Sequence, residues 1–387
     1  MNPAERHNVR PFKIDVPEAK VQAIRSALAA AHRGYAPDDD ENWKYGTEAA
    51  WFHDFVDYWI QDYDWSVAQE RLNRWPQYKT TIDGLDIHFY HVKGSGPRRA
   101  LILSHGWPGS VLEFQDVIER LAFPERSGGR AEDAFDLIIP SLPGYAFSAR
   151  PKTPIGPRKI AELWRSLMVD RLGYQRFSAQ GGDWGAAITT WLGADHADVV
   201  DAIHLNMIAS WIATGAEASS GADLAYRERL TQVQKREAGY SIVQATKPQT
   251  IGLALAASPY SFAAWVIEKF WAWADIQGGI ESRFSKELLA SNLMLYLLND
   301  AVISSLWLYR GRADEELMGM YGRLKVTVPT GVALFPAEFI PYPPKEVVNK
   351  YYNVTRWTEM KSGGHFAALE EPAAFSSEVR SFLLENI

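Results

Sequence analysis

The sequence predicts an α/β fold built on a mostly parallel, doubly wound sheet, with an inserted group of helices and a leading N-terminal segment. Strand-like runs alternate with helical patterns up to about residue 206, and this alternation favours a parallel sheet covered by helices on both faces. Residues 207–320 lose the strand pattern and become helical, rich in alanine, leucine and aromatic residues. Strand patterns return at 326–328 and 354–357, so the helical stretch is an insertion.

Four parts of the chain follow from this pattern. We expect a leading segment or meander at 1–90, a first part of the α/β core at 91–206, a helical lid at 207–320 and a second part of the core at 321–387. The length of 387 residues fits one large α/β unit with an insertion as well as it fits two or three domains.

The leading segment carries its own helix and hairpin signals. Asp15 followed by Pro17 predicts a helix start, and apolar residues at helical spacing continue from there. A second, aromatic-rich helix is predicted at 51–63. The runs 78–82 and 85–92 flank an Asp-Gly pair, which is a strong hairpin signal.

The core strands are predicted at 100–103, 135–139, 175–179 and 201–205, where short apolar runs are bounded by turn residues. Hydrophobic residues make up 47% of the chain, enough for a sizeable core. The 15 Trp, 17 Tyr and 17 Phe suit a deep apolar pocket, although a bulky core predicts the same composition.

Charge and composition exclude several classes of function. A net charge of -7 argues against nucleic acid or an anionic membrane as partner. Cysteine is absent, so no disulfide framework or thiol–metal site is expected. The first residues lack the apolar region of a signal peptide, and no run of about 18 apolar residues predicts a membrane span. We therefore expect a soluble, cytoplasmic protein.

No metal or phosphate-binding cofactor is expected. The histidines at 88, 91, 196 and 204 lack a convincing set of further ligands, and we interpret them as structural. The chain has no glycine-rich phosphate-binding loop.

The most informative motif is Gly-Gly-Asp-Trp-Gly at 181–185, between a predicted strand and a helix of small residues. This is the strand–sharp turn–helix context of a hydrolase nucleophile elbow, with aspartate where serine is usual. Asp183 is therefore a candidate nucleophile that forms an ester with a carbon electrophile. A helix N-cap is the alternative role for an aspartate here.

A second glycine-rich turn, His-Gly-Trp-Pro-Gly-Ser at 105–110, directly follows the strand at 100–103. Such a turn presents backbone N–H groups above the carboxyl edge of the sheet. With the N–H of Trp184, the residue after Asp183, the N–H of Trp107 would form an oxyanion hole. A plain strand-to-helix turn is the alternative.

His365 is the candidate general base. It lies in a Gly-Gly-His-Phe turn late in the chain, and nucleophile first with histidine last is the chain order of hydrolases with this elbow. Glu338, which follows the strand predicted from 326, is the candidate acid that orients it. Glu370 and Glu371 follow the histidine too closely for that role, and we interpret them as solvated charges at a helix start.

These motifs together resemble the epoxide hydrolases of the α/β-hydrolase superfamily, in their microsomal-type branch. The resemblance covers nearly the whole chain. It includes the segments 10–13 and 72–89 of the leading part, the two glycine-rich motifs described above, Phe-Pro-Ala-Glu at 335–338, and 363–372 around the histidine.

The resemblance implies further site residues. Tyr240 and Tyr309 match the two lid tyrosines that hydrogen-bond the epoxide oxygen in this family; a place in the aromatic core is the alternative for each. Two small departures are Ala146, where relatives usually have glycine, and Ala186, where some have serine. The membrane anchor of animal relatives is not seen here, so the chain resembles soluble microbial members.

The implied reaction is hydrolysis of an apolar, bulky or aryl epoxide to a vicinal diol without a cofactor. Asp183 attacks the epoxide while the two tyrosines protonate its oxygen. His365, oriented by Glu338, then activates water against the ester, and the two backbone N–H groups hold the oxyanion. The partners are a small-molecule epoxide and water; a homodimer is compatible with the resemblance, and neither nucleic acid nor membrane is expected.

Two other functions stay open at this point. A haloalkane dehalogenase shares the aspartate nucleophile and needs halide-binding donors such as a tryptophan after it, which Trp184 would supply. A non-catalytic protein could keep the hydrolase fold as a small-molecule receptor. The role of the reaction, whether in detoxification or in secondary metabolism, does not follow from the residues.

Overall fold

The computed structural model describes residues 8–208, 218–318 and 324–387. Within these ranges nine strands form one sheet in the order β1-β2-β3-β5-β4-β6-β7-β8-β9. The strands are β1 (Arg10–Phe12), β2 (Gln77–Ile82), β3 (Leu85–Val92), β4 (Ala100–Ser104), β5 (Asp136–Pro140), β6 (Phe177–Gly181), β7 (Val200–Leu205), β8 (Pro329–Leu334) and β9 (Asn353–Glu359).

The sheet has a parallel part and an antiparallel part. The six strands from β5 to β9 pair in parallel, whereas β1, β2 and β3 pair antiparallel and join the parallel part through β5. The predicted hairpin is present: β2 and β3 turn at Asp83 and Gly84, whose φ angles are 49° and 78°. Two positive φ angles are what a tight hairpin turn requires.

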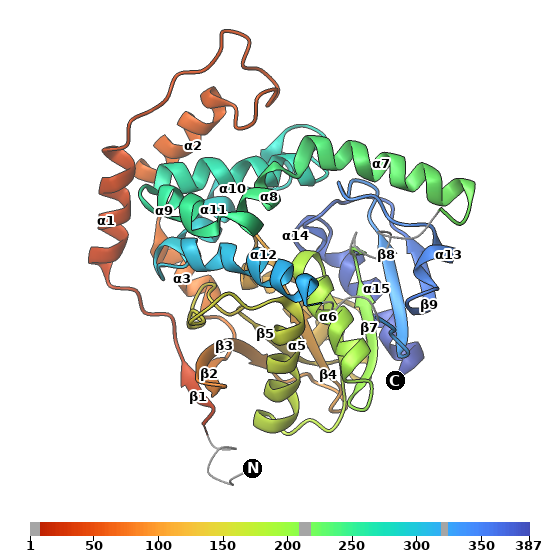
Figure 1. Cartoon of the computed structure of the whole chain (residues 1–387). Helices are drawn as coiled ribbons and strands as arrows, with labels where there is room; N and C mark the ends of the chain where they lie inside the picture. The colour runs from red at the N-terminus through yellow and green to blue at the C-terminus, as the bar shows by residue number, and fades with distance from the viewer. Residues whose placement is uncertain (1–7, 209–217, 319–323) are drawn as a thin grey trace.

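Helices cover both faces of the parallel part (Figure 1). On β4, Ile102 packs into a core shared with α5 (Pro157–Arg165) and α6 (Asp183–Asp195). Its neighbours Leu101 and Leu103 pack into a second core with α4 (Gln115–Ala122) and α15 (Pro372–Asn386). Successive residues of a strand point to opposite faces, so an all-apolar strand serves two cores. The predicted doubly wound α/β class is confirmed.

Between β7 and β8 the described residues 218–318 are mostly helical and lie across one end of the sheet (Figure 1). Its helices are α7 (Gly221–Glu237), α8 (Gly239–Thr246), α9 (Pro248–Ala256), α10 (Pro259–Trp273), α11 (Lys286–Leu297) and α12 (Val302–Leu317). We call this group of six helices the lid. Two short helices, α13 (Lys345–Val348) and α14 (Ala367–Glu370), follow in the last part of the chain.

The leading segment ties the lid to the sheet. Its helices α1 (Glu18–Ala29), α2 (Ala49–Gln61) and α3 (Trp65–Leu72) contact α10 or α11, while β1 extends the sheet beside β2. Trp43 stacks on Trp271 of the lid with ring centroids 5.3 Å apart, and the hydroxyl of Thr47 donates to the carbonyl of Ala264 over 2.7 Å. The lid is therefore held from its outer side as well as from the sheet.

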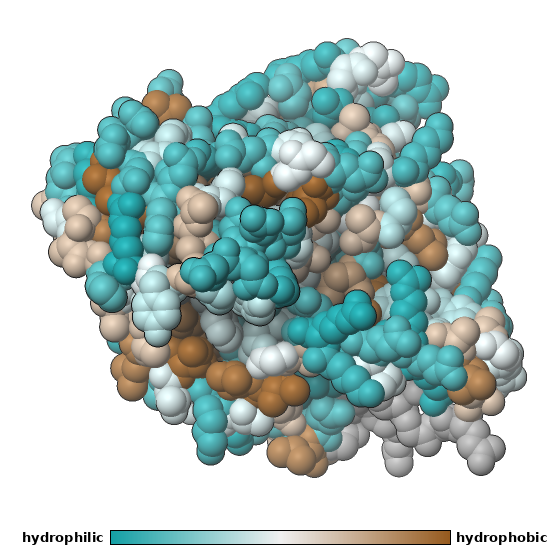
Figure 2. Space-filling view, turned by 90° about the horizontal axis from the view of Figure 1, so that it is seen from above, coloured by the Kyte–Doolittle hydropathy of each residue, from teal (hydrophilic) through white to brown (hydrophobic). Residues whose placement is uncertain are grey.

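The surface seen from above is mostly hydrophilic, with hydrophobic side chains gathered in a few patches (Figure 2). Exposed apolar residues of the lid include Ile242 and Leu253. Among the described residues no single helix is long and apolar enough to cross a membrane, although the bent pairs α9–α10 and α11–α12 pass that test of length and composition as pairs.

Several element boundaries differ from the sequence predictions, among them three near the helix start and the core strands. The first helix begins after Pro17, which occupies the N-cap position, so Asp15 does not cap it. The strand predicted at 175–179 runs two residues further, to Gly181. The strand expected from 326 begins at Pro329; Val326 only exchanges backbone hydrogen bonds with residues 351 and 353 before the regular ladder starts.

Candidate active site

Asp183 stands at the junction between β6 and α6. The strand ends at Gly181, and Asp183 is the first residue of the helix, with a φ of 47° that is strained for a residue with a side chain. The turn is tight, because a Cβ added to Gly181 would lie 2.1 Å from the carbonyl oxygen of Gly185, and one added to Gly185 would lie 1.8 Å from that of Ser104. Only glycine fits these two positions, as the motif predicts, and the strained turn raises the carboxylate above the end of the sheet.

The turn after β4 provides a hydrogen-bond donor to that carboxylate. The backbone N–H of Trp107 donates to Oδ1 of Asp183 over 2.8 Å. Trp184 lies in the first turn of α6, where backbone N–H groups have no partner within the helix. The lid fixes the turn from the other side, since the amide of Asn292 donates to the carbonyl of Pro108 over 2.8 Å and the hydroxyl of Tyr296 donates to that of Gly109.

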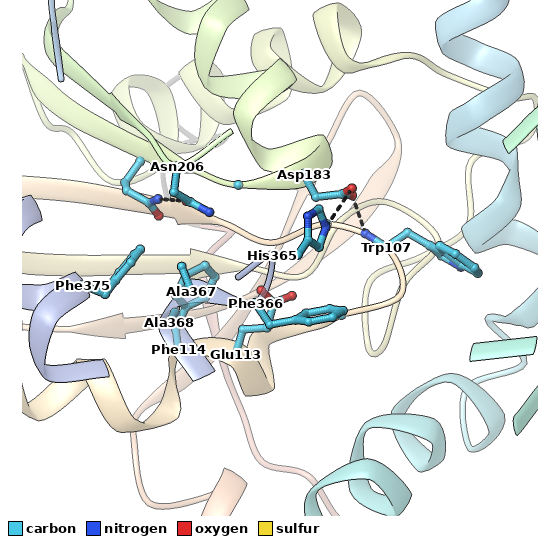
Figure 3. Close-up of a pocket in the computed structure, with 14 residues that line it drawn as sticks. Trp107, Glu113, Phe114, Asp183, Asn206, His365, Phe366, Ala367, Ala368 and Phe375 are labelled. Carbon is cyan, nitrogen blue, oxygen red and sulfur yellow. Dashed lines mark hydrogen bonds and ion pairs between the residues drawn. The ribbon is translucent and has the colours of Figure 1, made fainter. Parts of the chain in front are cut away.

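His365 and Glu338 complete a chain of polar contacts with Asp183, and Figure 3 shows the contact between His365 and Asp183. Nδ1 of His365 lies 2.9 Å and 3.1 Å from the two carboxylate oxygens of Glu338, and Nε2 lies 3.4 Å from Oδ2 of Asp183. The side chains of His365 and Glu338 are almost fully buried, and that of Asp183 is 16% exposed. With Nδ1–H donated to Glu338, Nε2 is the nitrogen that can take a proton on the side of Asp183.

Electrostatics favour a charged histidine in this arrangement. Burial by itself lowers the pKa of His365, but the charge of Glu338 and the contact with Asp183 outweigh burial and raise the pKa well above the ordinary histidine value. The imidazolium and the carboxylate of Asp183 therefore form an ion pair in the free protein.

The two predicted tyrosines come from different lid helices and meet over the carboxylate. Tyr240 belongs to α8 and Tyr309 to α12, and their rings lie edge to face with centroids 5.8 Å apart. Tyr240 stacks on Trp107 at 5.5 Å, and Tyr309 contacts Trp184 at 4.7 Å. Burial, joined by the charge of Asp183, raises the pKa of both phenols well above the ordinary tyrosine value, so both are neutral proton donors.

Two cavities meet at Asp183. The larger is open to solvent, has about 260 Å³ of space for the centre of a water-sized sphere, and is lined by both tyrosines together with apolar side chains such as Met207 and Ile340. The smaller, about 20 Å³ on the same measure, is lined by His365, Glu113 and the turn at Trp107. Among the lining residues only Asp183 belongs to both, so its carboxylate separates a substrate-sized pocket from a water-sized cavity.

One sequence interpretation is wrong and two contacts had no sequence signal. Glu370 is not a solvated charge at a helix start: it ends α14, is buried, and accepts hydrogen bonds of 2.7–2.9 Å from the backbone N–H groups of Asp275, Gly364 and Phe366. Three backbone N–H donors of the histidine loop and of the lid point inward and require an acceptor there, so the carboxylate is buried.

Glu113 and Lys269 also lie at the site, and neither follows a sequence pattern that distinguishes it from a surface charge.

In the described parts of the chain no three histidine, aspartate, glutamate or cysteine side chains lie close enough to hold a metal ion. Two of the four histidines interpreted as structural have hydrogen-bond partners: His88 contacts Ser141 and Gln77 at 2.9 Å each, and His91 contacts Tyr174 at 3.0 Å. His204 instead packs on Phe382, and its ring nitrogens have no hydrogen-bond partner among the described residues.

Comparison with known proteins gives the family. Residues 9–114 match the model for the epoxide hydrolase N terminus, and residues 99–251 match the model for the alpha/beta hydrolase fold. A protein of Stigmatella aurantiaca, provisionally named an epoxide hydrolase, is 39% identical, with 96% of this chain and 84% of that protein covered. Epoxide hydrolase 1 of Oryctolagus cuniculus is 34% identical, with 98% and 89% covered.

The fold agrees with this family. The crystal structure of juvenile hormone epoxide hydrolase from the silkworm Bombyx mori superposes with a TM-score of 0.84 at 29% identity, covering 97% of this chain and 94% of that one. The resemblance inferred from the motifs is therefore confirmed: this chain belongs to the epoxide hydrolases of the α/β-hydrolase superfamily, in the microsomal-type branch.

Proposed function

We propose that this epoxide hydrolase works through a covalent ester on Asp183 and acts on an apolar, bulky or aryl epoxide. The observation that carries the proposal is the position of Asp183 between the pocket with the two tyrosines and the cavity with His365. A nucleophile that reacts first with an epoxide and later with water needs access to both partners, and here Asp183 lines a separate cavity for each.

In the first step Oδ2 of Asp183 attacks one ring carbon of the epoxide, and the C–O bond of the ring breaks. Tyr240 and Tyr309 hydrogen-bond the ring oxygen and supply its proton. Their position over the pocket and their neutral state support this role. A positioned proton donor contributes on the order of 10²-fold or more to such a step.

Between the two steps the imidazolium of His365 releases a proton that restores the tyrosine pair, so His365 becomes neutral. In the second step His365 takes a proton from water, and the water oxygen attacks the ester carbonyl carbon of Asp183. The N–H groups of Trp107 and Trp184 hold the oxyanion, each worth about 3 kcal/mol, and the existing bond from Trp107 to Oδ1 supports this assignment. Glu338 keeps the imidazole oriented. Collapse of the tetrahedral intermediate breaks the ester bond, releases the diol and restores the carboxylate.

The lining of the larger pocket supports the substrate class. Aromatic rings of Trp184, Tyr240 and Tyr309 form one part, and aliphatic side chains of Met207, Ile242 and Ile340 form another. Apolar and aromatic linings with a few polar groups are typical of pockets for small apolar molecules. Arg312 at the same pocket adds a polar element.

Single-turnover hydrolysis in water labelled with ¹⁸O tests the covalent route. With enzyme in excess, the oxygen added in the first turnover comes from Asp183 and is unlabelled. Label in the first-turnover diol would mean direct attack by water and would reject the ester. A panel of aryl and alkyl epoxides, with Asp183→Ala as the inactive control, tests the substrate class; faster turnover of small polar epoxides would contradict it.

A further inference from the structure

Glu113 lies beside the proposed catalytic groups although no sequence motif assigns it there. It belongs to the short helix η2 (Val111–Phe114), directly after the turn that carries the N–H of Trp107. Its side chain lines the small cavity together with Asp183 and His365 (Figure 3). Gly109 leaves room for it, because a Cβ added to Gly109 would lie 1.7 Å from Oε1 of Glu113.

A structural role explains part of this position. Ser110 caps η2, its hydroxyl accepting from the N–H of Leu112 over 3.2 Å, and the carboxyl group of Glu113 bonds to the backbone of Ser110 and of Gly106. A serine followed three residues later by glutamate forms a capping box. A carboxyl group keeps acceptor capacity beyond two backbone bonds whether or not it is protonated, so Glu113 can still accept a hydrogen bond from the cavity.

The charges of the site act directly on this carboxyl group. Burial, the largest effect, and the carboxylate of Asp183 together raise the pKa of Glu113 to about 8, although the charge of His365 and the backbone hydrogen bonds oppose them. Glu113 therefore lies close enough to both groups to respond to the reaction, in which Asp183 loses its charge as it becomes an ester.

The small cavity is the place where a hydrolytic water fits. A cavity of about 20 Å³ has room for one ordered water, which needs two to four polar partners. Nε2 of His365 faces Asp183 and can accept one hydrogen bond from this water. Nε2 of Gln180, which also lines the cavity, donates to Oδ1 of Asn206 over 2.7 Å, and Oε1 of Gln180 has no hydrogen-bond partner among the described residues and is a further acceptor for the water. Besides Asp183 and His365, Glu113 is the one ionisable side chain among the lining residues described.

We propose that Glu113 is a further catalytic residue of the second step, which holds the attacking water in the small cavity together with His365. The inference rests on the covalent route proposed above. His365 accepts one proton of the water as its oxygen bonds to the carbonyl carbon of Asp183, and that proton later passes to the leaving alkoxide. Glu113 accepts a hydrogen bond from the other O–H and exchanges no proton.

Rapid-quench single turnovers of Glu113→Leu and Glu113→Gln test this role, with the ester on Asp183 quantified by mass spectrometry. Leucine fills the space without an acceptor. Glutamine keeps the shape, but its amide oxygen is drawn to the backbone donors and its N–H₂ then faces the water. We expect both variants to form the ester within about twofold of the wild-type rate and to hydrolyse it at least tenfold more slowly, since a misoriented water loses much of the benefit of proximity.

The Asp116→Asn variant is the matched control, because Asp116 is an exposed carboxylate on the adjoining α4. Ester decay at the wild-type rate in Glu113→Gln overturns the inference, and so does an equal slowing of both steps, which would indicate a purely structural capping role. If Glu113→Leu does not fold, Glu113→Gln decides alone. Absence of any ester in the wild type would instead overturn the covalent route, and the two failures are thereby distinguished.

Discussion

Nε2 of His365 lies 3.4 Å from Oδ2 of Asp183, so the proposed base and the proposed nucleophile form an ion pair before substrate binds. The pair holds the positive charge of the imidazolium next to the carboxylate that attacks the epoxide. Once Asp183 becomes an ester its charge is gone, and one of the causes that raise the pKa of His365 is gone with it. The pKa of His365 is therefore lower in the ester than in the free protein. The histidine is then neutral, and able to act as a base, at the stage where a base is needed.

The first prediction follows from this coupling. In Asp183→Asn the pKa of His365 should fall relative to the wild type, because the charge of Asp183 raises it, while Glu338 still holds it above the value that burial alone would give. Titration of the histidine side chains by ¹⁵N-edited NMR measures both values. An unchanged pKa would mean that Glu338 alone sets it. Epoxide turnover should be lost while the protein stays folded.

The tyrosine pair gives the second prediction. Tyr240→Phe and Tyr309→Phe should each slow ester formation by about 10²-fold, because each removes one proton donor to the ring oxygen, and both should leave ester decay nearly unchanged. Pre-steady-state quenching separates the two rates. Tyr226→Phe is a suitable control, since Tyr226 is also a buried lid tyrosine but lies outside the pocket lining. Equal slowing in the control would point to loss of lid packing.

Lys269 makes a contact that bears on the first step. Its ammonium group, on α10, lies 4.9 Å from the ring centroid of Tyr240 and 5.6 Å from that of Trp273, and the residue is only 8% exposed. Its counter-charges are the carboxylates of Glu268 and Glu237. A cation over a phenol ring stabilises the phenolate, so Lys269 favours proton release from Tyr240.

The third prediction is that Lys269→Met slows ester formation about fivefold, which corresponds to about 1 kcal/mol for a cation over an aromatic ring. Lys269→Arg keeps the charge and should restore most of the rate. Single-turnover rates as a function of pH provide the measurement. A slow Lys269→Arg variant with a normal Lys269→Met variant would show that size rather than charge matters at this position.

Much of this architecture could be predicted because its signals are local. The strands β4 and β5 contain the uninterrupted apolar runs 100–103 and 137–140, and the turns at Asp183 and Asp83 each need a positive φ angle that few residues adopt. The order of Asp183, Glu338 and His365 along the chain predicts that they belong together. In the structure His365 lies between the other two, 3.4 Å from Asp183 and 2.9 Å from Glu338.

The remaining features depend on contacts between distant parts of the chain. Glu113 has the local pattern of a helix cap, and only the fold turns its carboxyl group toward Asp183. Lys269 lies in the mostly apolar helix α10 with no local pattern that indicates a role, and only the packing of α8 near α10 puts it over Tyr240. Glu370 was misinterpreted for the same reason, since its three backbone donors lie in the lid and in the loop of His365.

Glu370 gives the last prediction, which concerns stability. Its carboxylate joins the N–H of Asp275 in the lid to those of Gly364 and Phe366 on either side of His365. Burial raises its pKa from 4.5 to about 7, against the opposing effect of these three hydrogen bonds. A raised carboxyl pKa means that the folded state binds the proton more tightly than the unfolded state does. This contribution to stability is therefore complete below about pH 4.5 and is lost as the pH rises through about 7.

Urea unfolding of the wild type and of Glu370→Gln at pH 4.5 and pH 7.5 measures this effect. The free energy of unfolding of the wild type relative to the variant should fall by about 2–3 kcal/mol over that interval, because the pKa difference between the two states corresponds to roughly 1.4 kcal/mol per unit. Glu371→Gln is the matched control: its carboxylate is more exposed and binds Arg283 over 2.9 Å. Parallel pH curves for the wild type and Glu370→Gln would show that the buried carboxyl group titrates as it does in the unfolded chain.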